Sequence, residues 1–154
     1  MSRYASNTTV AVDKSRAEIE RTLRRYGADK FAYGWDREKG QICFVHKERT
    51  IKIVLVLPAM SDFEKTRTGR KTRNQDAVLK AWEQACRQKW RALALVIKAK
   101  LEAVESGIAT FEDEFLAYTV LPDGSTAGEF MQPQIETALT CGTMPKLLIG
   151  QVGT

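Results

Sequence analysis

The chain has 154 residues and a formal net charge of +5, with 44% hydrophobic and 28% charged residues. This composition is typical of a soluble globular protein and excludes a disordered chain, and the length allows one core but not two comfortable domains. The longest uncharged apolar runs, Ile53–Met60 and Ala92–Ile97, are too short to cross a bilayer. The first residues contain no apolar segment of signal-peptide length, so we expect a cytoplasmic, single-domain protein without a membrane partner.

Cysteine and histidine usage limits the chemistry. Cys43, Cys86 and Cys141 are odd in number and lack metal-ligand spacing, which favours reduced thiols. His46 is the only histidine, so most metal sites and nucleophile–histidine pairs are excluded, and we interpret it as a structural residue near a strand edge. We expect no cofactor, no metal and no catalytic site.

The first 60 residues predict a helix followed by a sheet. Thr8–Val12 is either a short strand or an extended lead-in, and a helix then begins at Asp13 or Ser15 and ends at Gly27. Three strands rich in β-branched and aromatic residues follow: Lys30–Trp35, Gln41–Lys47 and Thr50–Leu57. Because the links between them are hairpin-sized, we predict an antiparallel meander.

One long helix, Asn74–Gly107, organises the rest of the chain. Asn74 is a good N-cap, Gly107 supplies a left-handed stop, and no proline or glycine interrupts the segment. At 1.5 Å per residue it would measure roughly 48 Å. Its apolar residues recur at spacings of three and four and so form one stripe: Leu79, Trp82, Cys86, Trp90, Leu93, Ile97, Leu101 and Val104. The polar segment Ser61–Arg73 before it predicts an exposed, mobile loop.

Two shorter helices are predicted after the long one. The first begins after Thr110 and reaches about Val120, with Phe111, Phe115 and Leu116 facing inward. The second runs from Gly128 or Glu129 to Thr140, with Pro133 early enough to be tolerated. We therefore predict one α+β domain over 1–154, divided into 1–60 (helix plus sheet), 61–73 (basic loop), 74–107 (long helix), 108–141 (helical extension) and 142–154 (tail).

Charge is distributed unevenly along the chain. Residues 64–100 hold 11 basic and 3 acidic side chains, whereas residues 101–136 hold 8 acidic side chains and no Lys or Arg. A basic loop that leads into a helix can bind phosphates, while an ordinary solvated surface is the alternative. The candidate contacts with nucleic acid or another polyanion are Lys65, Arg67, Arg70, Lys71, Arg73, Lys80, Arg87 and Arg91.

The acidic segment suggests a second function class. Glu112, Asp113 and Glu114 could dock a basic host protein, such as a defence or polymerase complex. Three successive acids on a helix point in different directions and no histidine joins them, so a metal site is disfavoured. Charges that complement the helix dipole explain them more simply.

Aromatic residues have two interpretations. Phe31, Tyr33, Trp35 and Phe44 could stack on unpaired bases. The first three share one face of a strand, and core burial is the more common fate of such a face. Trp82 and Trp90 lie in the apolar stripe of the long helix, where core or interface packing is expected.

The chain resembles a family of small uncharacterised proteins encoded by bacteriophages and prophages. The resemblance covers almost the whole length and rests most of all on KAWEQACRQKWRALALVIKAKLEAVESG at Lys80–Gly107. KSRAEIERTLRRYGA, GWD, FEDEFLA and LPDG add to it. It implies a phage origin and intracellular action, and it assigns no functional residue.

Together these features predict a non-enzymatic protein that binds nucleic acid, DNA in preference to RNA. The alternative is a protein–protein module that inhibits a host defence or polymerase complex through its acidic C-terminal segment. A homodimer is also predicted, because a three-stranded sheet is too short to cover the whole long helix. The competing outcome is that the C-terminal helices fold back over it.

Overall fold

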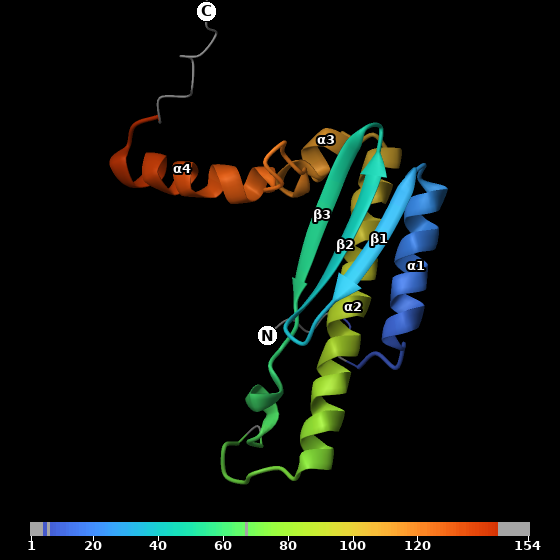
Figure 1. Cartoon of the computed structure of the whole chain (residues 1–154), viewed down its shortest axis with the longest axis vertical. Coiled ribbons are helices and arrows are strands. Elements are labelled where there is room, and N and C mark those ends of the chain that lie inside the picture. Colours follow the sequence, from blue (N-terminus) through green and yellow to red (C-terminus); the bar gives the residue numbers. More distant parts are fainter. Residues whose placement is uncertain (1–4, 6, 67, 145–154) are drawn as a thin grey trace, which may run out of the picture.

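The computed structural model describes residues 5, 7–66 and 68–144, and Figure 1 shows how its helices and strands are arranged. The elements are α1 (Val12–Arg25), β1 (Lys30–Trp35), β2 (Lys39–His46), β3 (Arg49–Val56), η1 (Met60–Phe63), α2 (Gln75–Glu105), α3 (Phe111–Glu114), η2 (Leu116–Tyr118) and α4 (Ala127–Cys141), of which η1 and η2 are 3-10 helices. The predicted α+β fold is confirmed. Thr8–Val12 contains no strand, and Val12 already belongs to α1.

The sheet is an antiparallel meander in the order β1-β2-β3, as predicted. The β1–β2 hairpin is closed by Asp36, whose Oδ1 accepts hydrogen bonds of 2.8 Å from the backbone N–H groups of Glu38 and Lys39. These two bonds lower the pKa of the Asp36 carboxyl. Lys47 and Glu48 turn β2 into β3 with φ values of 46° and 65°, the left-handed values that a two-residue hairpin requires.

The long helix α2 has 31 residues and measures about 46 Å. Asn74 caps its start, because the Asn74 Oδ1 accepts the N–H of Ala77 at 2.8 Å. Gly107, with φ of +72°, allows the chain to turn away beyond its end. The N-terminal part of α2 extends past the sheet, and η1 lies beside it (Figure 1). Trp82 links α2 to the segment before η1, since its indole N–H donates to the Pro58 carbonyl at 2.8 Å.

The core lies between the sheet and the two helices α1 and α2 (Figure 1). Its central side chains are Ile19 and Leu23 of α1, Ile42 and Phe44 of β2, Ile51 and Ile53 of β3, and Cys86, Trp90, Leu93, Ala94, Ile97 and Leu101 of α2. The predicted stripe of α2 is thus largely confirmed. Leu79 is 41% exposed, because α2 has run past the sheet at that point.

The predicted helix Thr110–Val120 is wrong beyond its first turn. Phe115 leaves the helical conformation, with φ of −111° and ψ of 12°, and the short η2 follows. Thr119 then pairs with Ile51, so the backbone after η2 joins the free edge of β3. The free edge of a strand offers unpaired backbone N–H and C=O groups to another segment. Local helix propensity does not reveal such long-range pairing. The break also leaves Leu116 57% exposed, although it was predicted to face inward.

The last helix, α4, projects sideways from the sheet and α2 (Figure 1), and none of its residues is buried. Thr126 and Glu129 form a reciprocal cap, in which each side chain accepts the other's backbone N–H at 3.2 Å and 2.7 Å. Pro133 lies in the interior of α4 rather than in its first turn, which corrects the prediction and removes one backbone hydrogen bond. α3 packs on α2 and α4 packs on η2, so α4 does not supply the predicted cover for α2.

Candidate nucleic-acid interface

The segment that precedes α2 is mostly exposed, as predicted, and it contains local backbone structure. η1 occupies its beginning, and the backbone after η1 folds back on itself. Lys65 pairs with Thr72 as an antiparallel bridge, and the Thr66 N–H donates to the Lys71 carbonyl at 2.8 Å. Gly69 adopts φ of +68° between these arms. We call the described residues 64–66 and 68–73 the basic hairpin.

The basic hairpin presents its cations at the start of α2. The side chains of Lys65, Arg70 and Lys71 are exposed. Arg73 is half-buried, and its Nη1 donates to the Phe63 carbonyl at 3.3 Å, so this guanidinium helps to hold the hairpin in place. Arg67, also predicted to contact phosphate, lies outside the described residues.

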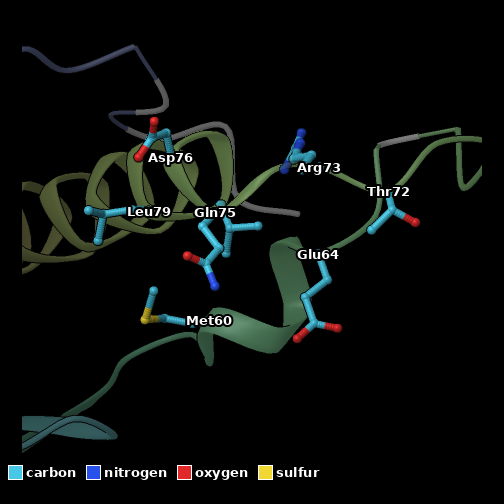
Figure 2. Close-up of a pocket in the computed structure, with 8 residues that line it drawn as sticks. Met60, Glu64, Thr72, Arg73, Gln75, Asp76 and Leu79 are labelled. Carbon is cyan, nitrogen blue, oxygen red and sulfur yellow. The ribbon is translucent and has the colours of Figure 1, made fainter.

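A hollow of about 540 Å³ lies between η1, the basic hairpin and the first turns of α2. Figure 2 shows Met60 of η1 on one side, Leu79 and Asp76 of α2 on the other, and Arg73 on the connecting backbone. Glu64 also lines it, so two carboxylates accompany one guanidinium. This balance disfavours phosphate inside the hollow, and the exposed cations of the basic hairpin lie outside its lining.

The predicted basic residues on α2 follow one side of the helix. Lys80, Arg87 and Arg91 are separated by seven and four residues, a spacing that places them on one line. Lys80 is exposed, whereas Arg91 is half-buried and forms an ion pair with Glu18 of α1. Arg87 donates to Gln84 Oε1 from Nε at 3.0 Å and from Nη2 at 2.7 Å. Arg91 therefore stabilises the contact between α1 and α2, and of the three cations only Lys80 is exposed.

The three successive acids do not form one acidic surface. Glu112 faces Arg49 at 3.7 Å, and Glu114 pairs with Lys100 at 3.0 Å. Asp113 is exposed at the start of α3, where its backbone N–H donates to the Thr110 hydroxyl at 3.1 Å. Two of the three carboxylates are therefore already matched by cations of the same chain.

A cleft of about 310 Å³ opens between the start of α1, the β1–β2 hairpin, the end of β3 and α2. We call it the Trp–Arg cleft after its principal lining residues, which are Trp35, Trp82, Trp90, Arg16, Arg37 and Arg87. Of these, the sequence analysis named Arg87 as a phosphate contact and considered Trp35 as a stacking residue, although it favoured the core for Trp35.

Two aromatic residues of β1 are far more exposed than predicted. Phe44 is 1% exposed and Phe31 half-buried, in agreement with a core assignment. Tyr33 and Trp35, however, are 54% and 69% exposed, although they share the helix-facing side of the sheet with Phe31. Their assignment to the core is wrong, because the layer above Tyr33 is filled by the Arg16 guanidinium, 4.8 Å from the ring centroid, and not by an apolar side chain.

Arg16 and Arg37 were missed by the sequence analysis. Arg16 carried a usable signal, since it lies on α1 beside the buried positions Ser15 and Ile19, where an apolar residue is the usual occupant. Arg37 carried none, because a cation in a hairpin turn is ordinary. The glycine opposite Trp35, Gly40, was a second signal, since a residue without a side chain leaves room beside an aromatic ring.

Comparisons of the chain with protein-family models, curated proteins and solved structures find no match. The phage origin, the cytoplasmic location and the homodimer therefore stay predictions. Over the described residues, no helix has the length and apolar character needed to cross a membrane. Within the same part of the chain, no group of His, Cys, Asp or Glu side chains could hold a metal ion.

Proposed function

We propose that this protein binds nucleic acid without catalysing a reaction, through the exposed cations of the basic hairpin and the start of α2. We call Lys65, Arg70, Lys71 and Lys80 the basic surface. The observation that carries the proposal is the folded form of the hairpin, which brings three exposed cations together just before α2, the helix that carries the exposed Lys80. A surface of this kind recognises phosphates and gives affinity with little sequence preference.

The two charged regions differ in the partners of their side chains. In the acidic segment, Glu112 and Glu114 face cations of the same chain. In the basic surface, no ion pair is present among the described residues for Arg70 or Lys71. This contrast favours a polyanion as the partner and gives less support to the alternative, a host protein docked on Glu112, Asp113 and Glu114.

Binding and its salt dependence test the proposal. We expect the protein to bind single- and double-stranded DNA and RNA of equal length at about 50 mM salt. The affinity should fall by orders of magnitude when the salt is raised to about 200 mM. Arg70→Gln combined with Lys71→Gln should weaken binding about 10- to 100-fold at the lower salt. The slope of log K against log salt should fall by about 0.7–0.9 for each phosphate that the variant no longer neutralises.

A matched control removes the same charge elsewhere. Lys30→Gln combined with Lys47→Gln changes two exposed lysines near the β2–β3 hairpin, at the other end of the sheet. This variant should bind within about threefold of the unchanged protein, since the changed charges lie farther from the basic surface than a Debye length of about 10 Å. Absence of binding to all four nucleic acids at low salt, or equal losses in the two double variants, would contradict the proposal.

A further inference from the structure

The Trp–Arg cleft is built where core packing would be expected. Trp35 stands opposite Gly40 in the β1–β2 pairing, so its side chain lies on the face of the sheet that the helices cover. Nevertheless 69% of its surface is exposed. An exposed indole on the covered face leaves an aromatic surface open to a planar ligand.

The floor of the cleft depends on the glycine opposite Trp35. Gly40 is buried, and a Cβ atom at this position would lie 2.5 Å from Trp90 Cζ2, closer than atoms approach one another. The absence of a side chain thus lets the Trp90 ring lie directly on the β2 backbone. Trp90 itself is 3% exposed, so it supports the cleft from below, and Trp35 offers the open aromatic face.

A guanidinium is held beside these rings. The Arg16 guanidinium lies 4.8 Å from the Tyr33 ring centroid and 5.6 Å from that of Trp90, and it forms an ion pair with Asp13. Its side chain is 16% exposed, whereas that of Asp13 is 88% exposed. Arg16 is therefore fixed by packing before any ligand arrives, which lowers the entropic cost of binding.

The charges around the cleft favour a ligand with acceptor groups. Three guanidinium groups line it, from Arg16, Arg37 and Arg87, against the carboxylates of Asp36 and Glu83. The Asp36 carboxylate already accepts two backbone N–H groups of the hairpin, so it is held at the turn. With Asp13 paired to Arg16 the charges around the cleft balance, so a cationic ligand would find no excess of carboxylates here. A purely apolar peptide would leave the guanidinium groups desolvated without acceptors.

Position links the cleft to the basic surface. Arg87 lines the cleft and lies on the same side of α2 as Lys80, two helical turns or about 10 Å away. A phosphate chain that follows Lys80 along α2 would therefore bring its bases to the cleft mouth. The volume of about 310 Å³ is at the lower end of the range for small-molecule sites, which admits one planar group and excludes a stacked duplex.

We propose that the Trp–Arg cleft takes one unpaired base of a single-stranded nucleic acid, with Trp35 as the stacking platform and the guanidinium groups as donors to base and phosphate oxygens. This inference rests on the proposed function and makes it specific, because it selects single strands over duplexes. Stacking on an aromatic side chain contributes about 1–3 kcal/mol per base.

The test compares Trp35→Ala with Trp35→Phe and with Phe130→Ala, in which an exposed aromatic residue of α4 is removed. Each protein is titrated at about 50 mM salt against a fluorescein-labelled single-stranded oligonucleotide and against a duplex of the same length. Trp35→Ala should weaken single-strand binding about 5- to 150-fold and change duplex binding less than about twofold. Trp35→Phe should recover most of the loss, and Phe130→Ala should bind like the unchanged protein.

Each outcome separates the two proposals. If the unchanged protein binds but Trp35→Ala binds single strands equally well, or weakens single strand and duplex alike, the cleft proposal is overturned and the basic surface stands. If the unchanged protein binds neither oligonucleotide, the proposed function is overturned and the cleft proposal with it. If Phe130→Ala weakens single-strand binding as much as Trp35→Ala does, the cleft is not the base site.

Discussion

Two groups of aromatic side chains occupy the two ends of the same layer between sheet and helices, and only one of them is closed. At the β2–β3 hairpin end, Phe44, Phe111 and Phe115 are 1%, 6% and 0% exposed. Phe115 meets Phe44 edge to face, with ring centroids 5.6 Å apart and an interplanar angle of 89°. At the other end, Tyr33 lies against the Arg16 guanidinium, and both Tyr33 and Trp35 remain largely exposed.

The element above each group accounts for this difference. α3 lies over the phenylalanine group, since its first residue is Phe111 and the following Phe115 completes the packing. Above Tyr33 the helix layer presents Arg16, and the segment 7–11 before α1 contains no helix or strand that could close the cleft. Aromatic residues on the covered face of a sheet are therefore core only where another element supplies apolar atoms above them.

The largest expected effect comes from a substitution in the closed group of phenylalanine residues. Phe115→Ala should lower the free energy of unfolding by about 3–5 kcal/mol, because it removes a fully buried ring from the contact between α3 and the sheet. Trp35→Ala should change it by about 0.5 kcal/mol or less, because its ring is 69% exposed. Urea unfolding followed by far-ultraviolet circular dichroism compares the two without depending on tryptophan emission. A loss from Trp35→Ala as large as that from Phe115→Ala would show that both groups are core.

Local signals in the sequence were sufficient for most of the fold. Asn74 and Gly107 predicted the ends of α2 because a cap and a left-handed stop act within one helical turn. The hairpin-sized links between the strands predicted the meander for the same reason. The break after Phe115 could not be predicted, since it depends on the pairing of Thr119 with Ile51, residues distant in the sequence.

The candidate site was predicted only in part. Charge density along the chain identified the cations of this segment, because they lie close together in the sequence and need no tertiary contact to be exposed. The role of Arg91 was not visible, because its partner Glu18 belongs to another helix. The cleft was also missed, since it requires Gly40, Trp90 and Arg16 to meet from three different elements.

A second prediction concerns Gly40, whose missing side chain leaves room for the Trp90 ring at the floor of the Trp–Arg cleft. In Gly40→Ala the new Cβ would lie 2.5 Å from Trp90 Cζ2 and 3.1 Å from Cη2, so the indole must move. The expected loss is about 1–3 kcal/mol of unfolding free energy, together with a shift of the tryptophan emission. Gly34→Ala is the matched control on the neighbouring strand, because a Cβ there meets nothing within 4 Å. It should be neutral or stabilising by up to about 1 kcal/mol, and equal losses in the two variants would contradict a floor made by Trp90 on Gly40.

The smallest expected effect concerns the reactivity of the Cys86 thiol, which reports how accessible the Trp–Arg cleft is. Cys86 lines it and is 7% exposed, whereas Cys141 at the end of α4 is exposed. Burial raises the pKa of the Cys86 thiol, and the Glu83 carboxylate raises it further, against the opposing effect of Arg87. Because the thiolate is the reacting form, a raised pKa means that less of it is present near neutral pH.

Alkylation by iodoacetamide, with each cysteine followed by mass spectrometry, should therefore modify Cys86 at least about tenfold more slowly than Cys141 near pH 8. The rate at Cys86 should continue to rise with pH beyond the ordinary thiol pKa of about 8.5, since burial raises the pKa of this thiol. Equal rates at the two residues would show that the cleft exposes Cys86 far more than its 7% accessibility implies. A saturating single-stranded oligonucleotide should slow Cys86 further and leave Cys141 unchanged, because a base stacked on Trp35 covers the route to the thiol.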